Sequence, residues 1–91
     1  MLITSKENTL AKALWSNATK EEREFIETYR REYFMTVGRC VTLFNNDLED
    51  MEDILDNLRE KYLFGAHYIN VNEERFDSLV IAHDIIKALE E

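Results

Sequence analysis

The chain contains no proline and only two glycines, Gly38 and Gly65, in 91 residues. Proline and glycine are the residues that most often interrupt helices and mark turns, so their near-absence predicts long, uninterrupted elements. Apolar residues make up 45% of the chain, as in an ordinary folded domain, and this content argues against disorder. The length fits a single helical domain over residues 1–91, with no room for a second core.

Apolar side chains recur at steps of three and four along four segments, which is the period of one helical face. The clearest stripe follows residues 26–44. In chain order, the four stripes consist of Leu10, Ala11, Leu14 and Ala18; of Ile26, Tyr29, Tyr33, Val37, Cys40 and Phe44, widened by Phe25, Phe34 and Val41; of Leu48, Met51, Leu55, Leu58 and Tyr62; and of Phe76, Leu79, Val80, His83, Ile86 and either Leu89 or Glu90.

Capping signals indicate where these helices begin. Two pairs, Thr4 with Glu7 and Thr19 with Glu22, have the spacing of a capping box, in which each side chain bonds a free backbone N–H of the first turn. Asn72 is a candidate N-cap for the last helix. We therefore predict helices over about residues 4–15, 20–44, 47–62 and 73–90, with turns at 16–19 and 45–46.

Two segments allow a second interpretation. Residues 39–44 continue the helical stripe, but they also alternate as a short strand would after Gly38; we favour the continuous helix. Residues 63–71 fit no helical stripe and are predicted to be a loop, or a short strand at 67–71. The predicted fold class is all-α (mainly α), a compact bundle of about four helices with this irregular segment near 63–71.

The formal net charge of −8 limits the kinds of partner. Nucleic acids and anionic membranes bind clustered Lys and Arg, so we expect neither direct nucleic-acid binding nor membrane binding. A basic protein partner fits the charge. The single cysteine, Cys40, and an N-terminus without an apolar signal segment favour a reducing, cytoplasmic location. A homodimer would enlarge the small core of so short a chain.

The negative charge is concentrated on the third predicted helix, where residues 47–60 contain seven carboxylates and only one arginine. Residues at i,i+4 lie about 5–6 Å apart on a helix, and like charges there are destabilising. Three interpretations are open: a solvated face, a docking surface for a basic protein partner, or a phosphate mimic of the kind made by phages as DNA-mimic inhibitors of restriction or defence proteins. The candidate partner-binding residues are Glu49, Asp50, Glu52, Asp53, Asp56 and Glu60.

Catalytic, cofactor and metal sites are not predicted. The acids lack the turn glycine and the alternation of a calcium loop, and the two histidines stand apart from other ligands. His83 and Cys40 fall on apolar stripes, where packing is the expected role. No phosphate-binding loop or nucleophile elbow occurs. A non-enzymatic adaptor or stoichiometric inhibitor therefore fits the sequence better than a small metal-dependent enzyme or enzyme subunit.

Two further groups of side chains could belong to an interface. Arg23, Arg30 and Arg31 form a weak basic patch that we expect to pair within its own helix, although it could also meet the acidic helix of a second copy. Glu27 lies four residues from both Arg23 and Arg31, and Glu24 and Glu32 are close by. Four large aromatic residues are candidates either for the core, which we favour, or for interface anchors. They are Trp15, Tyr62, Phe64 and Tyr68.

Overall fold

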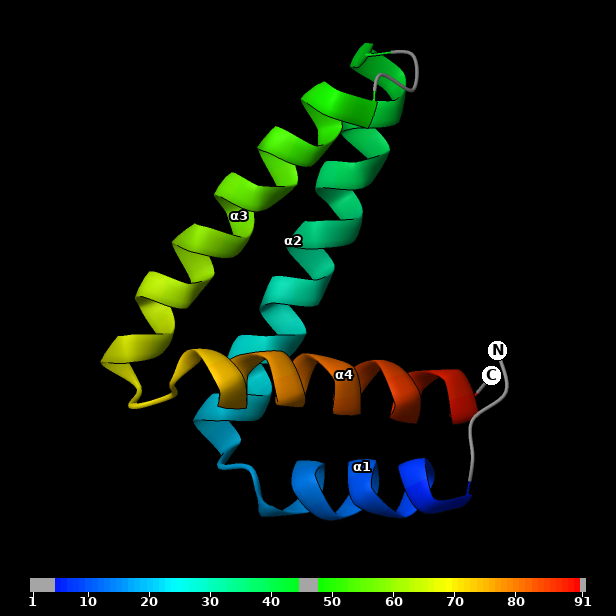
Figure 1. The fold of residues 1–91 in the computed structure, drawn as a ribbon, viewed down its shortest axis with the longest axis vertical. Helices are drawn as coiled ribbons and strands as arrows, with labels where there is room; N and C mark the ends of the chain where they lie inside the picture. The colour runs from blue at the N-terminus through cyan, green and yellow to red at the C-terminus, as the bar shows by residue number, and fades with distance from the viewer. Residues whose placement is uncertain (1–4, 45–47, 91) are drawn as a thin grey trace.

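The computed structural model describes residues 5–44 and 48–90, and these residues form four helices and no strand. The all-α fold of about four helices is therefore confirmed. Helices α2 and α3 form an antiparallel hairpin, α4 crosses the base of this hairpin, and α1 lies against α4 on the side away from the hairpin (Figure 1). The helices are α1 Ser5–Asn17, α2 Lys20–Phe44, α3 Leu48–Tyr68 and α4 Glu73–Glu90.

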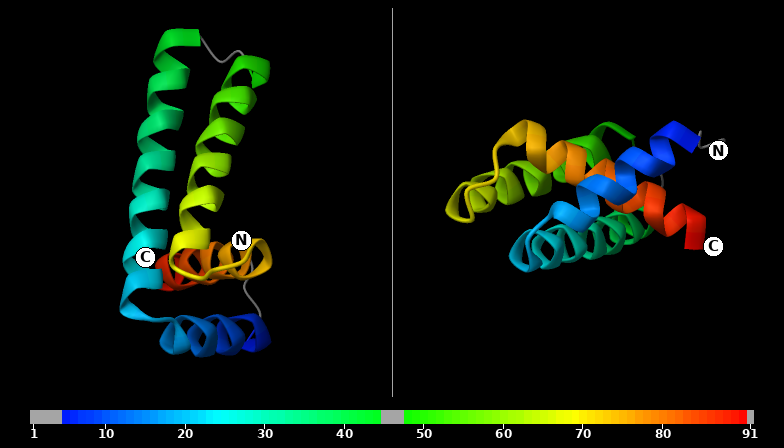
Figure 2. Two further views of the ribbon diagram at one scale, coloured as in Figure 1. Left: turned by 90° about the vertical axis from the view of Figure 1, so that its left-hand side faces the viewer. Right: turned by 90° about the horizontal axis from the view of Figure 1, so that it is seen from below.

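The arrangement is flat, with extents of 39 × 34 × 17 Å. The distal part of the α2–α3 hairpin extends well beyond α4, and the side of α3 that faces away from α2 is not covered by another helix in any of the views (Figures 1 and 2). This uncovered side of α3 is the part of the fold that positions the candidate site.

The core lies where α2, α3 and α4 meet, and it is rich in aromatic rings. The Tyr29 ring centroid is 5.1 Å from that of Tyr62 on α3 and 5.1 Å from that of Phe76 on α4. The partly buried Phe25 lies at the edge of this core, where its ring contacts those of Tyr62 and Phe76. Tyr29, Tyr62 and Phe76 are buried, so three of the predicted stripes do converge on one core.

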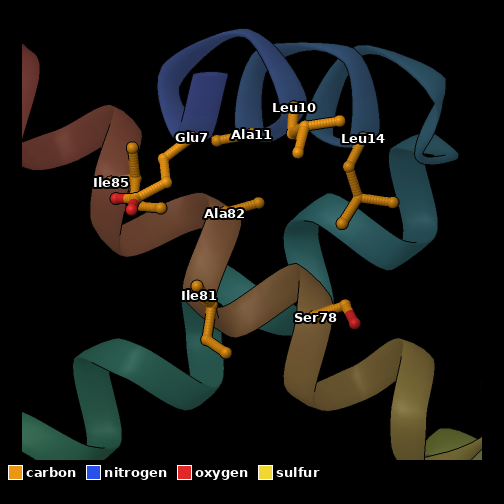
Figure 3. Close-up of a pocket in the computed structure, with 8 residues that line it drawn as sticks. All are labelled: Glu7, Leu10, Ala11, Leu14, Ser78, Ile81, Ala82 and Ile85. Atoms are coloured by element: carbon orange, nitrogen blue, oxygen red, sulfur yellow. The ribbon is translucent and has the colours of Figure 1, made fainter. Parts of the chain in front are cut away.

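Helix α1 packs against α4, with Trp15 edge-on to His83 at 5.5 Å between ring centroids. Ala11 and Ala18 are buried as the stripe predicts, but Leu10 is 59% exposed. An apolar groove remains between the two helices, and Figure 3 shows Leu10 and Leu14 on α1 with Ala82 and Ile85 on α4.

The junction between α1 and α2 contains the predicted capping box. Thr19 N–H donates to Glu22 Oε1 (2.9 Å) and Glu22 N–H donates to Thr19 Oγ1 (3.0 Å). The Glu22 carboxylate also accepts two hydrogen bonds from the Arg75 guanidinium in the first turn of α4, one of them at 3.1 Å. Asn72 Oδ1, the predicted N-cap, accepts from Arg75 N–H at 2.7 Å. Glu22 thus joins the starts of two helices that are 53 residues apart.

The prediction that residues 63–71 are irregular is wrong for 63–68, because α3 continues to Tyr68. The inner side of the helix continues through Gly65 and Ala66. These residues are too small to stand out as part of an apolar stripe in the sequence. Ala66 is fully buried, and a Cβ on Gly65 would lie 3.3 Å from the Phe25 ring, so these residues let α2 and α3 approach closely. The segment becomes irregular only after Tyr68, and it forms no strand.

Helix α3 ends in a Schellman motif with Asn70 in the left-handed conformation (φ 61°). Val71 N–H donates to the Ala66 carbonyl at 2.9 Å, and Asn70 N–H donates to the His67 carbonyl at 3.3 Å. The buried Val71 side chain packs in the core beside Ala66. The motif satisfies two carbonyls at the helix end and turns the chain into α4.

The continuous helix at residues 39–44 is confirmed up to Phe44, and the strand alternative is not observed. Ile26, Tyr29 and Cys40 of the predicted stripe are buried, whereas Phe34 and Val41, which were expected to widen it, are 61% and 43% exposed. Phe34 lines a surface hollow together with His83 and Asp84 of α4, but that helix does not cover it. Three predicted features fall outside the described residues, namely Thr4 of the first capping box, the turn at 45–46 and the helix start at Asp47.

Replacing Asn70 tests the helix end. Asn70→Ala should lower the free energy of unfolding by about 1 kcal/mol, because alanine tolerates the left-handed conformation less well than asparagine does. Asn70→Gly should be neutral or slightly stabilising, because glycine adopts this conformation without a Cβ clash. Urea unfolding followed by circular dichroism measures both. Equal destabilisation by alanine and glycine would contradict the assignment of the motif.

The Glu22–Arg75 contact predicts a specific pH dependence. Hydrogen bonds from Arg75, aided by Thr19, lower the pKa of Glu22 from 4.5 to about 2 even though burial acts to raise it. A carboxyl whose folded-state pKa is depressed stabilises the fold above its unfolded value, and this contribution is lost as the pH falls from 4.5 towards 2. At neutral pH it amounts to about 3 kcal/mol.

Glu22→Gln should therefore reduce stability strongly at pH 7, and its difference from the wild type should shrink as the pH approaches 2. Urea titrations across this range measure the difference, with Glu21→Gln as a control at an exposed neighbouring position. A Glu22→Gln effect that stays constant with pH would show that the carboxylate charge does not carry the contact.

Candidate functional site: the outer face of α3

Helix α3 has two chemically different sides. Its inner side carries Met51, Leu55, Leu58 and Tyr62, which are half-buried or buried as the sequence predicts. Its outer side carries the candidate acids: four of them step by 4, 3 and 4 along one line, and the other two flank that line. All six are exposed: Glu49, Asp50, Glu52, Asp53, Asp56 and Glu60.

The two cations of α3 point away from these acids. Arg59 Nη2 lies 2.8 and 3.0 Å from the two Asp77 carboxylate oxygens and 3.4 Å from Glu73 Oε1, both on α4. These hydrogen bonds, the one to Asp77 first, raise the pKa of Arg59. Lys61 Nζ lies 3.9 Å from Glu32 Oε2 on α2. The positive charge of α3 therefore neutralises acids on neighbouring helices and leaves its own outer side acidic.

Five of the six carboxylates form no hydrogen bond or ion pair within the described part of the chain: Glu49, Glu52, Asp53, Asp56 and Glu60. Three i,i+4 pairs of like charge occur among them, and each pair is destabilising by about 0.2–0.5 kcal/mol. The outer side of α3 is therefore a concentration of charge that the fold itself does not use.

Two exposed aromatic side chains continue the same side of α3 towards its C-terminus. Phe64 follows Glu60 by four residues, and Tyr68 follows Phe64 by four; they are 66% and 77% exposed. Their rings contact each other in a T-shaped arrangement at 5.4 Å between centroids. The prediction that the large aromatic residues pack in the core is confirmed for Tyr62, which is buried, and for Trp15, which packs against the core cluster. It is wrong for Phe64 and Tyr68.

The sequence did contain a signal for these two residues. Glu60, Phe64 and Tyr68 are related by steps of four, and so belong to the face of the acids once the helix is known to continue past Tyr62. The predicted helix end at Tyr62 concealed this relation. We use the name outer α3 face for the six acids together with Phe64 and Tyr68.

The other chemically active side chains have structural surroundings. His83 is buried under Trp15, with Nδ1 3.3 Å from Asp84 Oδ1, and Cys40 is buried at 2% exposure. Arg30 pairs with Asp84 on α4 (2.9 Å), whereas pairing within α2 was predicted for its patch. Among residues 5–44 and 48–90, no group of three or more His, Cys, Asp or Glu is placed to hold a metal ion. No helix in this part of the chain is both long and apolar enough to cross a membrane.

Comparison with protein families matches residues 35–62 to a model described as PHP-associated. The match covers the distal half of α2 and the first two thirds of α3, including all six acids, and it ends before Phe64. Comparisons with curated proteins and with solved structures gave no match.

The like-charge repulsion on the outer α3 face predicts a stabilising variant. Asp53→Asn, Asp56→Asn and Glu60→Gln together, here named the stripe variant, remove three i,i+4 repulsions. The variant should raise the free energy of unfolding by about 1 kcal/mol at low ionic strength, because each pair costs about 0.2–0.5 kcal/mol. Glu49 is kept because negative charge stabilises the first turn of a helix.

Urea unfolding at low and high salt checks this stabilisation, which should diminish as salt screens the charges. The control variant Glu24→Gln, Glu27→Gln and Glu90→Gln changes the net charge equally at exposed sites on α2 and α4 that lie outside the first turn of either helix. If the control variant is stabilised as much as the stripe variant, general net charge and not local repulsion is responsible.

Proposed function

We propose that this protein is a non-enzymatic binding protein, an adaptor or a stoichiometric inhibitor, that docks a basic surface of a protein partner through the outer α3 face. One observation carries the proposal: six exposed carboxylates lie on one side of a helix whose own cations pair with other helices. The free cysteine, Cys40, supports a reducing cytoplasmic setting.

The physical basis of this docking is charge complementarity. Five of these carboxylates, all but Asp50, have no hydrogen bond or ion pair among the described residues, so they remain hydrated and available to an approaching Lys or Arg. A surface of one sign attracts an oppositely charged partner at long range and raises its association rate, and salt screens this attraction. The repulsion that destabilises α3 in the free protein is relieved in the complex, which adds to the gain on binding.

The spacing of the acids supports a narrower version, in which the protein mimics nucleic-acid phosphates and inhibits a DNA-binding protein. Twelve residues of helix, Glu49 to Glu60, span about 16 Å, which gives about one charge per 3 Å along the axis. Duplex DNA carries one charge per about 1.7 Å and each single strand one per about 3.4 Å. The acidic part of the outer α3 face thus has about the linear charge density of one strand.

Affinity capture from a cell lysate, followed by mass spectrometry of the retained proteins, tests the function. Wild-type protein, the stripe variant and the charge-matched control variant serve as baits. We expect a protein with a basic surface to be retained by the wild type and the control variant and lost from the stripe variant. Identical partners on all three baits would show that the acids are only a solvated surface.

Elution with DNA separates the two versions of the function. A partner that DNA releases from the wild-type bait uses the same surface for nucleic acid, as the phosphate-mimic version requires. A partner that salt releases but DNA does not, and that still depends on Asp53, Asp56 and Glu60, supports docking of a basic protein surface.

A further inference from the structure

The aromatic pair Phe64–Tyr68 lies outside the core cluster of the fold. The inner side of α3 at this level is already filled by Tyr62, Ala66 and Ile69, and the helix end is closed by Asn70 and Val71. Tyr68 is the most exposed large apolar side chain among the described residues, and the two rings contact each other on the outside of the helix. Aromatic rings supply large apolar surface, so two left in water at one spot indicate a contact made outside this chain.

The charge beside the pair limits what can cover it. Glu60 lies one helical turn from Phe64, and the line of acids begins there. Nucleobases could stack on the rings, but their phosphates would meet the carboxylates, and an anionic membrane surface would be repelled in the same way. A partner with positive charge is attracted at this position.

A partner that carries only positive charge does not account for the rings. It would pair with the acids and leave Phe64 and Tyr68 exposed to water. The side chains that fit the whole outer α3 face are cations over the acidic part and an apolar group over the aromatic part. From Glu49 to Tyr68 this face extends about 28 Å, the length of about 19 residues of a partner helix.

We propose that Phe64 and Tyr68 are the apolar anchor of the outer α3 face, and that its ligand is a basic amphipathic helix of a protein partner. Lysines or arginines at steps of three and four on that helix face the acids, and one or two apolar side chains at one end cover the rings. The proposal rests on the proposed function, since the acids supply the complementary charge. The acids govern association and its salt dependence, and the aromatic anchor governs dissociation.

Two synthetic helical peptides of equal charge test the anchor. Both carry lysines at steps of three and four along about 18 residues, to span the face. One carries two leucines in its last turn, and the other carries serines there. Fluorescence anisotropy measures the binding of each peptide to the wild type, to Phe64→Ala/Tyr68→Ala, to the stripe variant, and to Phe34→Ala, which removes an exposed phenylalanine from α2.

We expect the wild type to bind the leucine peptide about tenfold more tightly than the serine peptide, as for a buried aromatic anchor. Phe64→Ala/Tyr68→Ala should bind both peptides equally, at the affinity of the wild type for the serine peptide. Phe34→Ala should behave as the wild type, and circular dichroism should show all variants folded, because the replaced side chains are exposed.

Each other outcome contradicts a particular part of this scheme. If the wild type does not distinguish the peptides while the stripe variant weakens both, the anchor is wrong and the acidic docking surface stands. If the stripe variant binds both peptides as tightly as the wild type does, the proposed function is wrong. Loss of leucine preference in Phe34→Ala would move the anchor to α2, and a wild type that binds neither peptide contradicts both proposals.

Discussion

The contact between Glu22 and Arg75 determines how the four helices meet. It joins the first turn of α2 to the first turn of α4 and holds α4 across the base of the hairpin. Two further ion pairs, Arg59 with Asp77 and Arg30 with Asp84, fix the same helix to α3 and α2. Three arginines are thereby engaged at helix–helix contacts. As a result, within residues 5–44 and 48–90, no cation pairs with the acids on the line along the outer side of α3, and no helix covers them.

The magnitudes explain how so acidic a surface is tolerated. One buried, hydrogen-bonded carboxylate such as Glu22 contributes about 3 kcal/mol at neutral pH, whereas the repulsions along α3 together cost about 1 kcal/mol. The core at the crossing of α2, α3 and α4 lies on the opposite side of α3 from the acids, so the repulsion acts on the surface of a helix that is already fixed by packing. The fold can therefore keep a line of like charges that binding would relieve.

Much of this could be predicted from local sequence patterns. The apolar stripes predicted the four helices, and the spacing of Thr19 and Glu22 predicted a capping box that the structure contains. Asn72 was correctly predicted to cap the last helix. These predictions succeed because each signal depends on neighbouring residues alone. The exposure of all six acids followed from their position opposite the apolar stripe.

What could not be predicted depends on contacts between distant segments. Gly65 and Ala66 serve as core residues only because Phe25 and α2 approach them, so the end of α3 was placed too early and the exposed pair Phe64–Tyr68 was missed. The direction of Arg59 depends on where α4 lies.

Nuclear magnetic resonance can show directly whether the outer α3 face is the binding surface. Nitrogen-15-labelled protein would be titrated with the leucine-bearing basic peptide and the backbone amide shifts followed residue by residue. We predict that the perturbed amides lie on α3 between Glu49 and Tyr68, with α1 and the facing part of α4 unchanged. Perturbations centred on the apolar groove around Leu10 and Ile81, with α3 unaffected, would contradict docking through the outer α3 face.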